Sequence, residues 1–177
     1  MKPKEKQRRF EEQVTPHLKP AFNLARWMTR SQEDAEDVVQ EAFLRAFAAF
    51  DGLRGDAKPW LLTIVRNTSL DWLKRNRNRA LSGYEAAAEA AEPSPDPEES
   101  LLISTDREQV RRALEQLPLD FRETVILREM EGLSYKEIAA TTGVPMGTVM
   151  SRLARGRDWL KRLLSTPESI EREGGGR

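Results

Sequence analysis

Residues 133–164 read LSYKEIAATTGVPMGTVMSRLARGRDWLKRLL, and this stretch predicts the fold of the second half of the chain. Ser134 followed by Glu137 is a capping box that begins a short helix. Gly143 can adopt the positive φ that ends this helix, and Pro145 suits the start of a second helix that continues to the end of the stretch. A short helix, a glycine-containing turn and a longer helix are typical of the helix-turn-helix motif.

The second helix of this motif carries two faces when its residues are placed at about 100° each. The inward residues are apolar: Val149, Leu153, Leu160 and Leu164. The N-terminal half of a recognition helix enters the major groove, where arginine pairs with guanine and hydroxyls reach bases or phosphates. The predicted DNA contacts on the outward face are Thr148, Ser151, Arg152 and Arg155. An ordinary helical hairpin with a basic face is the alternative.

A stretch that cannot build a core separates this motif from the first half of the chain. Residues 83–105 read GYEAAAEAAEPSPDPEESLLIST, with clustered prolines, many acids and few large apolar side chains. We expect an acidic, proline-rich linker between two segments of about 80 and 70 residues, each near the lower size limit for an independent core. The predicted organisation is a domain in residues 1–82, this linker, a domain in residues 106–165 and a disordered tail in residues 166–177.

Apolar residues recur at helical spacing throughout, so the predicted fold is all-α with two small helical domains. The second domain is expected to be a four-helix unit that contains the helix-turn-helix. Ser31 is expected to cap the second helix of the first domain, with Asp34 as the acid of its capping box. One buried stripe is predicted on that helix: Val39, Phe43, Phe47 and Phe50. The three helices of the first domain are expected at about residues 10–28, 31–50 and 59–77.

The third helix of the first domain has a polar stripe beside its core face. The core face comprises Leu61, Ile64, Val65, Thr68 and Trp72. The stripe comprises Trp60, Thr63, Asn67, Asp71 and Lys74, and Arg75, Arg77 and Arg79 follow it. An aromatic ring, an amide, a hydroxyl and cations along one edge can stack on bases and bond to base edges and phosphates. A solvated helix face with a half-exposed Trp60 explains the stripe equally well.

Composition excludes several classes of protein and site. The chain has no cysteine and one histidine, His17, which excludes a disulfide framework, a thiolate zinc site and a histidine-rich metal cluster. We expect no catalytic residues, cofactor or metal, because no glycine-rich phosphate loop or nucleophile–histidine pattern is present. A cytoplasmic protein without membrane insertion is expected. The net charge is zero, but the charges of residues 31–52 sum to −5 and those of residues 83–110 to −7. Such charge blocks indicate separate surfaces for separate partners.

Three stretches resemble the extracytoplasmic-function class of bacterial sigma-70 family factors. They are DAEDVVQEAFLRAF (34–47), GDAKPWLLTIVRNTSLDWLKRNRNR (55–79) and LPLDFRETVILREMEGLSYKEIAATTGVPMGTVMSRLARGRDWLKRLL (117–164). The resemblance covers both domains in the family's order, with a linker between them. One departure is Met150, which stands where the family often has a basic residue.

This resemblance assigns roles to three sets of residues. The first set implies docking on core RNA polymerase: Asp37, Gln40 and Glu41. The second implies capture of the melted minus-ten element: Trp60, Asn67, Asp71, Lys74, Arg75 and Arg77. The third implies recognition of the minus-thirty-five element: Thr148, Ser151, Arg152 and Arg155. The implied partners are core RNA polymerase, promoter DNA and an anti-sigma factor, and the free protein is expected to be monomeric. The linker is either a tether or a segment that occupies the cationic RNA exit path.

Two other classes of function explain less of the sequence. A stand-alone helix-turn-helix regulator accounts for residues 133–164 but leaves residues 34–79 without a purpose, and such regulators usually dimerise on palindromes. A nuclease or phosphotransferase would need paired metal carboxylates or a nucleophile, and the sequence pattern contains neither. The sequence therefore favours a promoter-specificity factor that lends DNA recognition to a catalytic polymerase.

Overall fold

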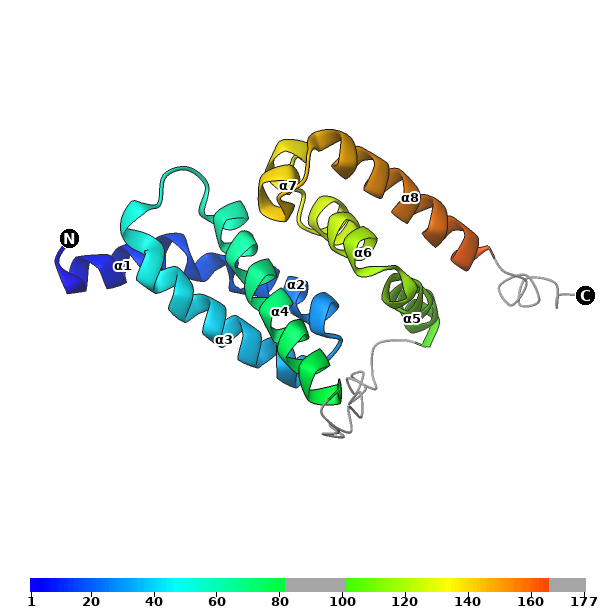
Figure 1. Cartoon of the computed structure of the whole chain (residues 1–177), viewed down its shortest axis with the longest axis horizontal. Helices are drawn as coiled ribbons and strands as arrows, with labels where there is room; N and C mark the ends of the chain where they lie inside the picture. The colour runs from blue at the N-terminus through cyan, green and yellow to red at the C-terminus, as the bar shows by residue number, and fades with distance from the viewer. Residues whose placement is uncertain (82–100, 166–177) are drawn as a thin grey trace, which may run out of the picture.

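The computed structural model describes residues 1–81 and 101–165, and every regular element in these ranges is helical (Figure 1). The first domain contains α1 (Pro3–Gln13), a 3-10 turn (Thr15–His17), α2 (Leu18–Thr29), α3 (Gln32–Ala49), a second 3-10 turn (Phe50–Gly52) and α4 (Ala57–Leu81). The second domain contains α5 (Leu101–Gln116), α6 (Leu119–Val125), a π turn (Ile126–Met130), α7 (Tyr135–Thr142) and α8 (Met146–Leu164). The predicted all-α fold is confirmed.

Two helix boundaries differ from those predicted. The helix expected at residues 10–28 is divided into α1 and α2, because Pro16 lacks the N–H that would continue the ladder and instead opens a 3-10 turn. Helix α5 begins at Leu101, inside the stretch predicted as linker, because no proline or glycine follows Pro97 to stop it. The rest of that linker and the tail in residues 166–177 lie outside the described residues.

The core of the first domain lies between α2, α3 and α4. Ser31 caps α3 as predicted, because its Oγ accepts the backbone N–H of Asp34 at 3.3 Å, but the Ser31 N–H donates to the Thr29 hydroxyl and not to the Asp34 carboxylate expected to complete a capping box. The predicted aromatic stripe of α3 is wrong at one position, since Phe47 is 38% exposed. Its ring lies at the edge of the core, where Phe10 contacts it on one side and the Lys6 ammonium lies 4.9 Å from its centroid.

The helix-turn-helix forms as its local signals predict. The Ser134 Oγ accepts from the Glu137 backbone N–H at 3.1 Å, and the Glu137 carboxylate accepts from the Ser134 N–H at 2.9 Å. Gly143 ends α7 with φ 72°, and α8 begins directly after Pro145. The prediction that Leu164 points inward is wrong, since its side chain is exposed at the C-terminal end of α8.

Close packing of α8 on α6 depends on Gly156. A Cβ atom at this position would lie 2.8 Å from the Val125 Cγ2, so only glycine permits this approach of the two helices. Leu153 and Val149, one and two turns earlier on α8, are fully buried. The crossing thereby sets which side of α8 remains open to solvent. No helix in the described ranges is long and apolar enough to cross a membrane.

Candidate nucleic-acid and docking surfaces

The N-terminal half of α8 presents a mixed surface rather than a continuous basic one. Ser151 and Arg155 are exposed, as predicted for groups that reach DNA. Thr148 is half-buried, and the Arg152 side chain is only 21% exposed because its guanidinium lies 3.7 Å from the Asp120 carboxylate of α6. Of the four predicted contacts, two are therefore open and two lie toward the body of the domain.

Two methionines that sequence reasoning did not assign stand beside these residues. Met146 and Met150 are both exposed, one turn apart on α8. Their positions in the sequence place them off the apolar face of the helix, and this spacing is the signal from which their exposure could have been predicted. An apolar side chain on a recognition helix can contact the thymine methyl group in the major groove. The outward side of α8 therefore offers both polar and apolar contacts.

The polar stripe of α4 is not open along its whole length. Asn67, Lys74 and Arg77 are exposed, whereas Trp60 is half-buried with its ring centroid 6.4 Å from that of Phe50. The Thr63 hydroxyl contacts the Thr141 hydroxyl of α7 at 2.9 Å, so the second domain covers this part of the stripe. The helix therefore offers a free polar edge mainly in its C-terminal half.

The remaining residues of the predicted minus-ten set form a chain of ion pairs with α3. The Asp71 carboxylate accepts from the Arg45 Nη1 at 2.9 Å, and the Arg45 Nη2 donates to the Glu41 Oε1 at 2.6 Å. The other oxygen of Glu41 accepts from the Arg75 Nη2 at 3.1 Å. The hydrogen bond to Asp71 raises the pKa of Arg45, with Glu41 adding to it, so the guanidinium stays charged. Arg45, which the sequence analysis missed, thus links the predicted docking and minus-ten sets.

The outward face of α3 brings acidic, amide and apolar side chains together. Asp37 and Gln40 are exposed, and Glu41 is half-buried in the ion-pair chain. Leu44 lies two turns from Asp37 on the same face and is 70% exposed. This face therefore offers both charged and apolar contacts to solvent. Neither the buried stripe nor the acidic contact set predicted on this helix includes Leu44.

The structure also bears on catalytic and metal sites. Within residues 1–81 and 101–165, no group of three or more histidine, cysteine or carboxylate side chains could hold a metal ion. His17 lies in the 3-10 turn between α1 and α2.

Comparison with known proteins identifies the two domains. A family model of Sigma-70 region 2 matches residues 13–79, and a model of Sigma-70, region 4 matches residues 107–160. The ECF RNA polymerase sigma-E factor of Escherichia coli strain K12 is 41% identical over 135 residues, which cover 71% of each protein. The ECF RNA polymerase sigma factor SigE of Mycolicibacterium smegmatis is 37% identical over 162 residues, which are 90% of this chain and 63% of that protein.

Two solved structures are similar to the whole described arrangement. The sigma factor RpoE in complex with the anti-sigma factor NepR from Bartonella quintana has a TM-score of 0.75 at 31% identity, covering 89% of this chain and 97% of that one. CnrH in complex with the cytosolic domain of CnrY has a TM-score of 0.63 at 26% identity, with 89% and 88% coverage. These matches do not favour a stand-alone regulator. The chain belongs to the extracytoplasmic-function class of the sigma-70 family and is a sigma factor for transcription initiation.

Proposed function

We propose that this sigma factor docks on core RNA polymerase through the outward face of α3 and reads promoters with α4 and α8. The main support is that the two matched family regions coincide with two helical domains that each expose polar side chains on one helix. Core polymerase would supply the chemistry, in the cytoplasm, and this chain would supply recognition. Joining two modest DNA contacts in one chain strengthens both, because the second contact becomes intramolecular.

The minus-ten contacts proposed on α4 divide into direct and supporting residues. Asn67, Lys74 and Arg77 are exposed and can reach bases or phosphates directly. Trp60 is half-buried, and the exposed part of its side chain can contact a flipped base. Asp71 and Arg75 act as positioning residues, because each is held by the ion-pair chain through Arg45 and Glu41.

The docking proposal predicts a specific loss of polymerase binding. Asp37→Lys should weaken association with core polymerase by about ten-fold or more, because the exposed acid is proposed to face a basic partner surface. Glu12→Lys makes the same charge change on an exposed residue of α1 and should leave the affinity near that of the natural protein. Fluorescence-detected titration with core polymerase measures both. Equal losses in the two variants would remove the docking surface from α3.

The promoter-reading proposal is tested by run-off transcription with purified bacterial core polymerase on fragmented DNA from the protein's own source. Start sites that depend on the protein and share two upstream elements are expected. Arg155→Ala should then lower transcript yield from these promoters by about ten-fold, because one base or phosphate contact contributes about 1–3 kcal/mol.

A matched variant separates this contact from general charge. Arg162 lies two turns beyond Arg155 on the same side of α8, is exposed and pairs with Asp158. Arg162→Ala should keep the transcript yield within about two-fold of the natural protein. A full yield from Arg155→Ala would reject α8 as the upstream reader. If no start site depends on the protein while core is active under another sigma factor, the proposed function fails.

An anti-sigma factor is proposed as a further partner. The solved proteins with the similar arrangement are sigma factors held by anti-sigma factors, which supports this expectation for the present chain. Exposed apolar side chains on both domains, among them Leu44 and Met150, provide surfaces that such a partner could cover. The free protein is proposed to be a monomer.

A further inference from the structure

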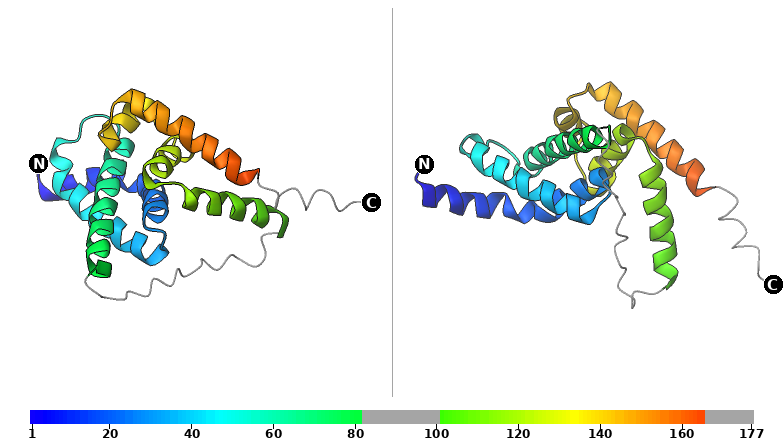
Figure 2. Two further views of the ribbon diagram at one scale, coloured as in Figure 1. Left: turned by 45° about the vertical axis from the view of Figure 1, so that its right-hand side comes forward. Right: turned by 60° about the horizontal axis from the view of Figure 1, so that its bottom comes forward.

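Two rows of side chains lie next to each other on the outward side of α8. At about 100° per residue, residues four apart follow one another along the same side of a helix. The buried residues of this helix, Val149, Leu153 and Gly156, lie on the opposite side. In both views of Figure 2, α8 runs along the edge of the fold. The first outward row comprises Met146, Met150 and Ala154, the second comprises Gly147, Ser151 and Arg155, and all six residues are exposed.

The first row presents an apolar surface to water. Met150 is 47% exposed and Met146 is 44% exposed, although methionine is among the residue types most often buried in proteins. The methionine side chain is unbranched and polarisable, so it adapts its shape to a small apolar group on a partner. Ala154, the next residue of the row, is too short to cover Met150. The row is therefore open to such a group.

The charge of α8 indicates which kind of partner carries that group. The helix contains five basic residues and one acidic residue, a net charge of +4, which favours a polyanion such as DNA. The short side chains of Gly147 and Ala154 let the helix backbone approach base edges closely. In the major groove, the apolar group that base edges offer is the 5-methyl group of thymine.

We propose that Met150 determines promoter specificity by contacting the 5-methyl group of one thymine in the upstream element. This inference rests on the proposed function of α8 as the reader of that element. Arg155, in the neighbouring row, contacts a base or a phosphate, and Met150 selects an A·T pair at its own position because other bases lack the methyl group. Met146 extends the apolar row toward the start of the helix and shields this contact from water.

Deoxyuridine tests the inference, because it differs from thymidine only in lacking the 5-methyl group. A promoter identified by the run-off experiment is prepared with each thymine of its upstream element, on either strand, replaced in turn by deoxyuridine. Core polymerase assembled with the full chain is titrated onto each fluorescently labelled duplex. At one position, deoxyuridine should weaken binding about three- to five-fold, the loss expected for one buried methyl group.

Met150→Ala should remove this sensitivity. On the natural promoter, the variant should bind about three- to five-fold more weakly than the natural protein. Deoxyuridine at the sensitive position should then weaken its binding by less than about 1.5-fold, because both changes remove the same contact and their effects do not add. Met150→Leu keeps an apolar side chain and should retain a deoxyuridine effect of at least about two-fold.

Met130 provides the matched control. It is 50% exposed and lies in the π turn of the same domain, outside α8. Met130→Ala should keep both the affinity for the natural promoter and the response to deoxyuridine. A response that is lost to the same extent in Met130→Ala and Met150→Ala would overturn the assignment, because the loss would then not depend on the row on α8.

The remaining outcomes separate this inference from the proposed function. An upstream element without an A·T pair, or one in which no thymine responds to deoxyuridine, overturns the role of Met150. A response that persists in Met150→Ala but disappears in Met146→Ala overturns it as well. In each case the transcripts still depend on the protein, so the sigma role stands. The absence of any start site that depends on the protein instead rejects the proposed function, and this inference with it.

Discussion

Replacing Arg122 with methionine should lower the free energy of unfolding by about 3–5 kcal/mol, because hydrogen bonds from one charged group to four backbone carbonyls are lost together. Methionine retains a long apolar stem but donates no hydrogen bond. The substitution would remove the Leu117 and Trp27 carbonyls' side-chain donor, and a buried acceptor left without a partner is costly. Urea unfolding monitored by circular dichroism measures the change in midpoint and slope.

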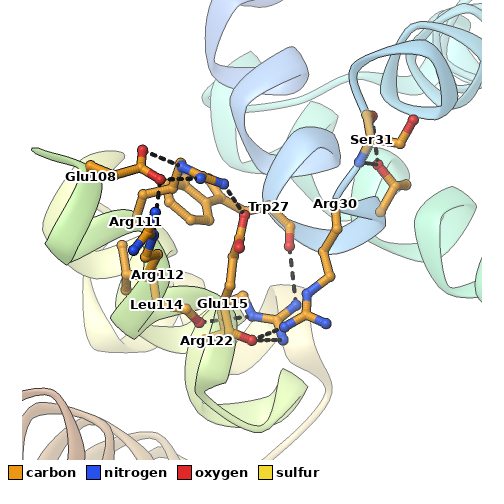
Figure 3. A network of polar contacts seen from close by, with 10 residues as sticks. Trp27, Arg30, Ser31, Glu108, Arg111, Arg112, Leu114, Glu115 and Arg122 are labelled. Carbon is orange, nitrogen blue, oxygen red and sulfur yellow. Dashed lines mark hydrogen bonds and ion pairs between the residues drawn. The ribbon is translucent and has the colours of Figure 1, made fainter. Parts of the chain in front are cut away.

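The expected size of the destabilisation follows from the number of hydrogen bonds that the Arg122 guanidinium donates. Arg122 donates to the carbonyls of Leu114, Glu115 and Leu117 at 3.1, 3.2 and 2.9 Å, and to the carbonyl of Trp27 in the first domain at 3.1 Å (Figure 3). Burial, with the nearby charge of Arg30, lowers the pKa of Arg122 to about 10, although Glu115 opposes this shift. The group is therefore still charged at neutral pH and donates to the backbone carbonyls at the C-terminal end of α5.

Arg30 is the matched control for Arg122. It donates to the same Glu115 carbonyl from the other domain, and the two side chains approach that oxygen side by side (Figure 3). Arg30 is exposed, so water replaces its contact. Arg30→Met should change the free energy of unfolding by no more than about 0.5 kcal/mol. If both methionine variants lose the same small amount, the network at Arg122 is not a major source of stability.

Replacing Phe10 with alanine should also lower the free energy of unfolding by about 3–5 kcal/mol. Phe10 is the buried residue of α1 and is 8% exposed. Its ring meets Phe43, Phe47 and Phe50 edge-on at centroid distances of 6.0, 5.2 and 5.4 Å. Alanine would remove both the buried area and the contact that holds α1 to α3, so amide hydrogens of α1 should exchange much faster.

Phe47→Ala provides the comparison, because it removes the same atoms from a neighbouring ring of the same cluster. Phe47 is 38% exposed, so its loss should cost about half as much or less. Thermal unfolding and hydrogen exchange of both variants measure the difference. Equal losses would show that the cluster responds as a whole and that Phe10 has no special role in holding α1.

The helix-turn-helix could be predicted in detail because its signals act within a few residues. The capping box joins residues three apart, Gly143 permits a positive φ, and Pro145 excludes continuation of the previous helix. The cap of α3 at Ser31 is the same kind of local signal. The break between α1 and α2 at Pro16 is also a local effect. It was not predicted because apolar residues at helical spacing on both sides of Pro16 indicated one continuous helix. Helix boundaries follow breakers more closely than they follow periodicity.

The exposure and the ion-pair partner of each polar side chain could not be predicted from such local signals. Periodicity placed Asn67, Asp71 and Arg152 on outward faces; Asn67 and Asp71 are exposed there, whereas Arg152 is half-buried. Asp71 pairs with Arg45 from α3, and Arg152 lies against Asp120 of α6. These partners are many residues distant, so a stripe drawn on one helix cannot reveal them.

The sequence by itself therefore determined the class of fold, the recognition helix and the family of the protein. Those properties depend on patterns within single helices and on motifs read along the chain. Only the tertiary structure decided which polar groups remain free, that Arg122 is buried among carbonyls, and that Arg66 meets Glu123. An ion pair needs both charges within about 4 Å, and that proximity depends on how α4 and α6 pack, which neither helix encodes alone.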